Sequence, residues 1–134
     1  MSIKLVAVSA AAALISGLAL AQGVPEVKVQ ATRVINTAIS AKTVGRTSSG
    51  VPIKEITLSY GVSAEGLDLS TNTGATAFEQ RVKDAAEQAC KDISHQYPDA
   101  TPGDAQCAKT AADAAMPRVH ELVAAAEKTR LATK

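Results

Sequence analysis

Apolar and polar residues alternate along residues 26–35. The apolar positions Val27, Val29 and Ala31 are separated from one another by polar side chains. A period of two places the apolar side chains on one face of an extended chain, as in a strand that is buried on one side. We therefore predict a half-buried β-strand over this segment.

Two further strands are predicted on either side of a turn. Residues 47–50 (Thr-Ser-Ser-Gly) are typical of a turn, and residues 41–46 and 51–60 flank them as candidate strands. Because Pro52 has no amide proton, we expect it at the start of its strand or at a sheet edge. The three segments predict a short antiparallel sheet in the N-terminal half, with a hairpin around the turn.

Apolar residues recur every three or four positions over residues 74–94, which is the spacing of one face of a helix. Phe78 and Val82 lie on this stripe, whereas the opposite face is charged. Thr71 or Thr73 is placed to cap the N-terminus. We predict an amphipathic helix whose charged face is in contact with water.

A second helix is predicted over residues 105–128, with Asp104 as its N-cap. Its apolar stripe consists largely of alanine, which allows the two helices to approach each other closely. Pro117 lies inside this segment, and a proline removes one helical hydrogen bond and clashes with the preceding turn. The helix is therefore expected to kink or to break there.

The N-terminal segment has the three parts of a secretion signal. Lys4 supplies positive charge, an apolar run covers residues 5–20, and Ala19-Leu20-Ala21 matches the small-x-small pattern that signal peptidase cleaves. We predict a signal peptide over residues 1–21 and cleavage between Ala21 and Gln22.

The alternative for this segment is a membrane anchor. Its apolar run is shorter than the ~20 residues that a spanning helix needs, and it contains Ser9, Ser16 and Gly17. No cysteine lies near the predicted cleavage site, which excludes a lipoprotein anchor. We expect residues 22–134 to form a single small domain without stable membrane insertion, located in the periplasm or secreted.

The composition of the mature chain excludes some classes of partner. The chain has 14 basic and 13 acidic residues, and loss of Lys4 with the signal makes the two counts equal. A neutral chain has no electrostatic attraction to nucleic acid or anionic lipid. Its aromatic residues, Tyr60, Phe78 and Tyr97, are too few for a base-stacking platform. We predict no nucleic-acid binding.

Cys90 and Cys107 are the two cysteines of the sequence. In an exported protein an even number of cysteines indicates a disulfide, and closure of a loop of about sixteen residues contributes ~3 kcal/mol to stability. The alternatives are a metal site that includes His95 and His120, and a reactive thiol. Zinc-ligand spacing and a Cys-x-x-Cys motif are both missing. We predict a structural disulfide that joins the two helices near their connecting loop.

A series of short motifs extends from the third predicted strand to the second predicted helix. They are Val51-Pro52-Ile53-Lys54, Val62-Ser63, Leu67-Asp68-Leu69-Ser70, Gly74-Ala75, Arg81-Val82, Ala85-Ala86, Cys90, Cys107, Ala111 and Ala115. In this order they resemble the UrcA family of small, signal-bearing bacterial proteins. Where that pattern has an aromatic and an acidic residue, this chain has Ala64-Glu65-Gly66, so no surface role of that loop is carried over. The resemblance implies an exported, periplasmic, two-cysteine α+β domain, and it implies no activity.

The sequence contains no Gly-x-Ser-x-Gly, His-Glu-x-x-His or phosphate-binding glycine motif. His95, in the predicted loop, and His120, on the second helix, lack a neighbouring nucleophile and an orienting group. We interpret both as exposed polar residues. Asp68 is interpreted as bonding to backbone amides at the turn before the first helix. We predict no enzymatic activity, no cofactor and no catalytic residue.

The predicted fold is α+β, with the short antiparallel sheet packed against a disulfide-linked C-terminal helix hairpin. The side chains that we expect at the sheet–helix contact are Ile56, Leu58, Leu69, Phe78, Val82, Val119 and Leu122. Our functional hypothesis is a non-enzymatic accessory protein that contacts another protein or the envelope, for example through an open sheet edge. The alternative is a ligand-binding or metal-binding protein linked to envelope stress, which would use Asp99, Asp104, His95 and the glutamate-rich first helix.

Overall fold

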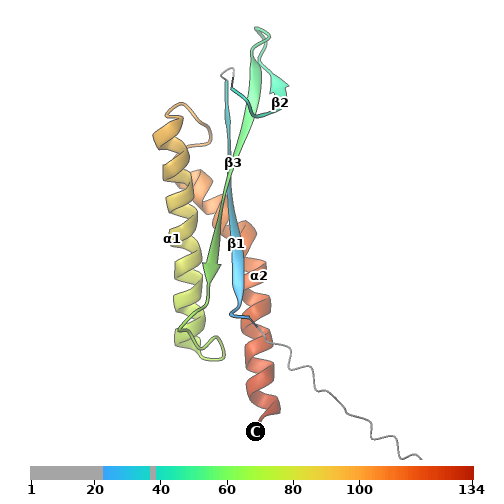
Figure 1. Ribbon diagram of the computed structural model, residues 1–134, viewed down its shortest axis with the longest axis vertical. Helices are drawn as coiled ribbons and strands as arrows, with labels where there is room; N and C mark the ends of the chain where they lie inside the picture. Colours follow the sequence, from blue (N-terminus) through green and yellow to red (C-terminus); the bar gives the residue numbers. More distant parts are fainter. Residues whose placement is uncertain (1–22, 37–38) are drawn as a thin grey trace, which may run out of the picture.

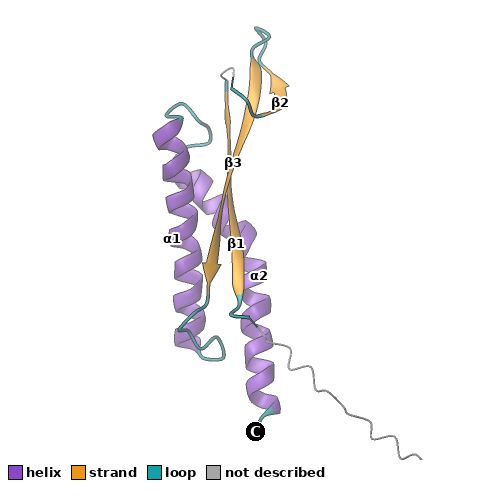
Figure 2. Cartoon of the chain, viewed as in Figure 1, coloured by secondary structure: helices purple, strands orange, loops and turns teal. Residues whose placement is uncertain are grey.

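The computed structural model describes residues 23–36 and 39–134, and the predicted cleavage site at Ala21 and Gln22 lies outside them. A three-stranded antiparallel sheet packs against two helices, which confirms the predicted α+β fold (Figure 1, Figure 2). In chain order the elements are β1 (Glu26–Ile35), β2 (Lys42–Arg46), β3 (Pro52–Ser63), α1 (Asn72–Gln96) and α2 (Asp104–Ala132). Within the described ranges, no helix carries an apolar stretch of the length that spans a bilayer.

β3 is the central strand of the sheet, whose order is β1-β3-β2. β1 pairs with β3 along its whole length, from Glu26 opposite Ser63 to Ile35 opposite Lys54. β2 pairs only with residues 52–55 at the start of β3. The predicted hairpin between β2 and β3 is therefore confirmed, and it covers only a short part of the outer side of β3.

The hairpin of β2 and the adjoining part of β3 extends beyond the ends of the helices (Figure 1). Its turn contains Gly50 with a φ of 85°, a conformation that glycine adopts without strain. Pro52 is the first residue of β3, as predicted. We refer to residues 42–55 as the arm.

The core lies between one face of the sheet and the two helices. Alternate residues of β1, from Val27 to Ile35, face the helices and are buried. The predicted core residues that are buried are Leu69, Phe78, Val82 and Val119. Ile56, Leu58 and Leu122 are only partly buried, which corrects the prediction. For the two β3 residues the reason is that α2 packs on β1 and α1, so that α1 is the helix that covers β3.

α1 begins after Thr71, whose hydroxyl accepts a hydrogen bond from the amide of Gly74 at 3.1 Å. Thr71, and not Thr73, is therefore the N-cap. A Cβ atom at Gly74 would lie 1.9 Å from the carbonyl oxygen of Asp68, so the turn and the helix can approach this closely only at a glycine. The last turn of α1 includes His95, which corrects its predicted position in the loop.

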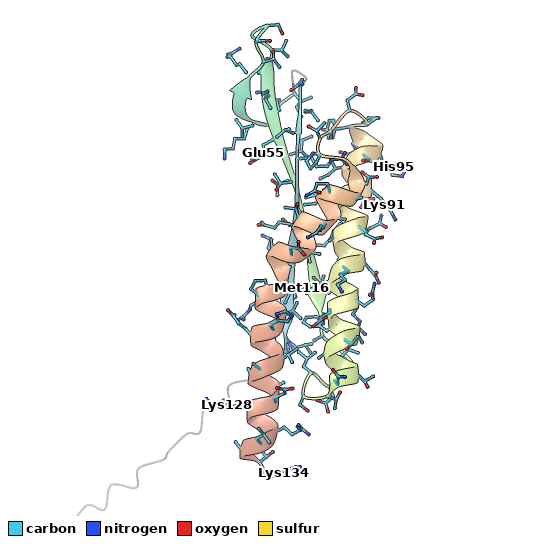
Figure 3. All side chains as sticks on the ribbon, turned by 180° about the vertical axis from the view of Figure 1, so that it is seen from behind. Glu55, Lys91, His95, Met116, Lys128 and Lys134 are labelled. Carbon is cyan, nitrogen blue, oxygen red and sulfur yellow. A yellow bond between two sulfur atoms is a disulfide. The ribbon has the colours of Figure 1, made fainter. Side chains whose placement is uncertain are left out.

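α2 is one continuous helix that contains Pro117. Figure 3 shows the helix changing direction near Met116, so the helix is kinked and not broken. Its N-cap is Gly103, without a side-chain hydrogen bond, which corrects the prediction that Asp104 caps the helix. The carboxylate of Asp104 is instead bound by other side chains.

Candidate functional site

A disulfide joins Cys90 of α1 to Cys107 of α2, which confirms the predicted pairing. The two Cα atoms are 6.0 Å apart, and both side chains are buried in the core. In the described part of the chain no cysteine is free, so neither thiol can act as a metal ligand or as a nucleophile. The bond fixes the C-terminal part of α1 to the first turn of α2, close to the loop that connects the helices.

Arg33 is a buried cation that sequence reasoning missed. Its side chain lies on the helix-facing side of β1 and is 3% exposed. Nη1 donates hydrogen bonds to the carbonyl oxygen of Cys90 at 3.2 Å, to a carboxylate oxygen of Asp104 at 2.7 Å and to the hydroxyl of Ser94. Nη2 donates to the carbonyl oxygen of Ala100. One guanidinium group thus connects β1 with α1, with the interhelical loop and with α2.

Asp104 is the carboxylate that neutralises Arg33. The hydrogen bond from the Ser94 hydroxyl lowers the pKa of Asp104, as do the hydrogen bond and the positive charge of Arg33, although partial desolvation opposes them. A buried guanidinium is costly to the fold unless a counter-ion and hydrogen bonds compensate it. Among the described residues Nε of Arg33 has no partner. We refer to Arg33, Ser94 and Asp104 as the arginine cluster. Because Nη1 and Nη2 of Arg33 donate hydrogen bonds inside the fold, we interpret this cluster as a structural connection between elements.

The position of Arg33 in the alternating pattern was the signal that could have identified it. Arg33 follows Ala31 by two residues and therefore shares the buried face of β1 with Val27 and Val29. A cation on a buried face requires a counter-ion. The sequence does not indicate which carboxylate this is, because Asp104 lies 71 positions away.

Asp68 closes the turn that precedes α1, which confirms its interpretation. Its Oδ1 accepts hydrogen bonds from the backbone amide of Ser70 at 2.9 Å and from the Ser70 hydroxyl at 2.6 Å. Both hydrogen bonds from Ser70, first that of its hydroxyl and then that of its amide, lower the pKa of Asp68. The side chain therefore shapes the turn, and among the described residues it has no partner for proton transfer.

The remaining candidate residues do not assemble into a site. His95 is exposed at the end of α1, near Lys91 (Figure 3). His120 is exposed on α2, and its Nε2 lies 3.5 Å from a carboxylate oxygen of Glu79 on α1. Asp99 is exposed in the interhelical loop. Over the ranges that the structure describes, no three His, Cys, Asp or Glu side chains gather closely enough to hold a metal ion.

A shallow groove of about 510 Å³ lies between α1 and α2. Its floor consists of alanine side chains and its walls of charges of both signs, among them the ion pairs Lys91–Glu87 and Lys109–Asp113. The lining residues are Lys83, Glu87, Lys91, Asp104, Ala105, Ala108, Lys109, Ala112 and Asp113. This lining includes no serine, cysteine or histidine, so it provides no pair of nucleophile and base.

The arm is the most exposed part of the sheet. Val44 is 44% exposed and Val51 is 39% exposed, although both are large apolar residues. β2 is an edge strand of the sheet, so its outer backbone groups face away from β3. Lys42 and Arg46 add two exposed cations to the same edge. The arm therefore combines apolar surface, positive charge and an open strand edge.

Comparisons of the chain with protein-family models, with curated proteins and with solved structures give no match. No activity or partner can therefore be transferred from a relative. The arm, the sheet edges and the clusters inside the fold are the features from which a function has to be inferred.

Proposed function

We propose that this chain is an exported, non-enzymatic accessory protein that binds another protein of the cell envelope through the arm. The observation that carries the proposal is that the arm extends beyond the helices and exposes Val44 and Val51 (Figure 1). Exposed apolar side chains on a projecting element can form a site that another chain covers. An open strand edge beside them can accept a further strand through backbone hydrogen bonds.

Charge narrows the kind of partner that fits the arm. Lys42, Arg46 and Lys54 are its basic residues, and Glu55 is its one acidic residue. Glu55 lies 3.7 Å from Lys42, while Lys54 donates hydrogen bonds to the hydroxyl of Thr43 in the arm and to the carbonyl of Ala41 just before it. An extended partner segment that alternates apolar and acidic side chains complements this surface.

Export follows from the predicted signal peptide over residues 1–21. The disulfide Cys90–Cys107 supports it, because such bonds persist in oxidising compartments outside the cytoplasm. The motifs that resemble the UrcA family support the same location. We therefore place the protein in the periplasm or in the medium as part of this proposal.

The metal-binding alternative loses one of its candidate ligands. Oδ1 of Asp104 accepts hydrogen bonds from Arg33 and from Ser94, and the positive charge of Arg33 beside this carboxylate opposes the binding of a second cation.

Photo-crosslinking in living cells tests the proposal. A photo-reactive residue in place of Val44 is expected to form a crosslink to one partner protein. The same residue in place of Glu87, which is exposed on α1, is the control and is expected to form none. The double substitution Val44→Ser and Val51→Ser should reduce co-purification of that partner without changing the thermal stability. A crosslink pattern that is the same at both positions, or the absence of any crosslink, would contradict the proposal.

A further inference from the structure

The outer side of β3 is unpaired beyond β2. β2 covers β3 only as far as Glu55. Residues 56–62 have β1 on one side, and no strand of the described chain lies on their other side. The sheet therefore has an open edge on its central strand, next to α1.

The hydrogen bonds of Val34 establish which backbone groups point toward this edge. The amide and the carbonyl of Val34 bond to Thr101, outside the sheet, so they point away from β3. By alternation, the residue of β3 opposite Val34 and every second residue after it point away from β1. These are Thr57, Ser59 and Gly61, which are all exposed. Their backbone groups have no hydrogen-bond partner among the described residues.

The open edges of the sheet differ in charge. β1 carries the exposed residues Glu26 and Lys28, and β2 carries Lys42 and Arg46. Charged side chains on an edge strand disfavour pairing with a second copy of the same strand, because like charges are brought together. Residues 56–62 (Ile-Thr-Leu-Ser-Tyr-Gly-Val) carry no charge. The edge of β3 can therefore face a copy of itself without like charges among the paired residues themselves. The carboxylate of Glu26 on β1 lies beside Gly61 at one end of this stretch.

The helix-facing side of this stretch is incompletely buried. Ile56, Leu58 and Tyr60 are only partly buried, whereas Ala31, which lies opposite Leu58 on β1, is fully buried. The hydroxyl of Tyr60 donates to Asp92 of α1, which holds the ring beside the open edge. A strand added to this edge would remove further apolar surface from water, and this is favourable.

We propose that two copies of this chain associate through the outer edges of β3, antiparallel about a two-fold axis near Tyr60. Ser59 of each copy then exchanges backbone hydrogen bonds with Gly61 of the other copy, and the two sheets become one continuous sheet. A two-fold axis brings identical surfaces together, which the uncharged sequence of this edge permits. In this register Ser63 lies opposite Thr57, so the second strand ends before the part of β3 that β2 covers.

This inference goes beyond the proposed function and is tested separately from it, because the arm stays free in the dimer. The exported protein, purified with its disulfide intact, is expected to show a reversible monomer–dimer equilibrium in sedimentation and light-scattering measurements. The amides of Thr57, Ser59 and Gly61 should exchange with deuterium more slowly as the protein concentration rises. A chain that stays monomeric up to about 1 mM would overturn the proposal.

A matched pair of proline substitutions identifies the edge that is used. Ser59→Pro removes an amide that points outward from β3, and Gln30→Pro removes one that points outward from β1. The two residues lie opposite each other and share one side-chain hydrogen bond of 3.4 Å, so both variants lose that bond. Ser59→Pro should raise the dissociation constant of the dimer by about 10- to 100-fold, and Gln30→Pro should leave it unchanged. Equal effects of the two substitutions would overturn the assignment to β3.

A charge substitution keeps the test valid if a proline prevents folding. Ser59→Lys brings two like charges close to the two-fold axis and should also raise the dissociation constant by about tenfold at low salt. Because salt screens the repulsion, the effect should shrink at high salt. Dimerisation that is insensitive to Ser59→Lys at low salt would exclude this interface.

Discussion

Arg33 of β1 and Asp104 at the start of α2 form an ion pair in which Nη1 and a carboxylate oxygen are 2.7 Å apart. The same guanidinium donates to the hydroxyl of Ser94 and to the carbonyl of Cys90. Cys90 is also bonded covalently to Cys107. An electrostatic and a covalent connection therefore hold the same end of the helix hairpin, and the electrostatic one also attaches that end to the sheet.

Substitution of Arg33 by alanine is expected to lower the free energy of unfolding by about 2–4 kcal/mol. The change removes a buried side chain, leaves the carboxylate of Asp104 without its cation and removes the donor to the carbonyl group of Ala100. Urea unfolding followed by circular dichroism measures the loss. Arg118→Ala is the control, because Arg118 forms a surface ion pair with Glu121, and its loss should cost less than about 1 kcal/mol. Similar losses in both variants would show that the arginine cluster does not have the proposed structural role.

Asp104 predicts a loss of stability in acid. Its pKa is lowered in the folded protein by the Ser94 hydroxyl and by Arg33. The carboxylate therefore contributes stability above its unfolded pKa of about 4, and this contribution is lost as the pH falls through the lower folded pKa. The free energy of unfolding, measured with urea from about pH 7 to about pH 2, should fall less steeply in acid for Asp104→Asn than for the wild type. We refer to this fall in acid as the acid limb. Asp99→Asn, in the exposed loop, should leave the limb unchanged.

Other carboxylates limit how much of the acid limb this variant removes. The pKa of Asp92 is lowered, mainly by the hydrogen bond from the Tyr60 hydroxyl, and the pKa of Asp68 is lowered by Ser70. Asp104→Asn should therefore still lose stability in acid, but less steeply below about pH 4. Parallel profiles for the variant and the wild type would contradict the contribution of Asp104.

The pattern along residues 26–35 predicts β1 correctly because one face of the strand is covered along its entire length. The sequence predicts an end of β3 near Tyr60, whereas the strand continues to Ser63. Gly61 has a low strand propensity, but its pairing with Lys28, the third pair from the end of the β1–β3 ladder, overrides it. The local pattern around Tyr60 does not show where β3 ends. Its last residues pair with the start of β1, which lies more than twenty residues earlier in the sequence.

The disulfide and the arginine cluster lie side by side and differ in how far the sequence predicts them. Cys90 and Cys107 allow only one pairing, so the expectation of export was sufficient to predict the disulfide. Asp104 precedes a helix and is therefore interpreted as an N-cap, but in the fold its carboxylate is bound by Arg33 and Ser94. Asp104 therefore binds side chains of β1 and α1 instead of the first amides of its own helix. This choice depends on how the sheet packs against the helices, which a local sequence pattern does not contain.

Removal of the disulfide is expected to destabilise the protein without changing its fold. The double substitution Cys90→Ala and Cys107→Ala should lower the free energy of unfolding by about 3 kcal/mol, because the unfolded chain regains the entropy of the open loop. Guanidinium unfolding of the variant and of the chemically reduced wild type measures this loss, and the two should agree. Mass spectrometry of the wild type purified without reductant should find no free thiol. Two free thiols in that material, or an unchanged unfolding midpoint, would contradict a structural role.

Gly74 lies where the turn closed by Asp68 meets the first turn of α1. A Cβ atom at this position would be 1.9 Å from the carbonyl oxygen of Asp68 and 2.6 Å from its carbonyl carbon. Both are backbone atoms, and Asp68 is held by Ser70, so the turn itself must move. Gly74→Ala should therefore lower the free energy of unfolding by about 1–3 kcal/mol, although alanine has the higher helix propensity.

Gly45→Ala is the matched control for this substitution. A Cβ atom at Gly45 would meet only the terminal methyl of Ile53, at 3.7 Å, which is ordinary contact. Thermal unfolding should place this variant within about 0.5 kcal/mol of the wild type. If Gly74→Ala were equally stable, the close approach between the turn and α1 would not be a constraint on the sequence. If only Gly74→Ala is destabilised, the requirement for glycine belongs to the junction of the sheet and the helix hairpin and not to glycines of the chain in general.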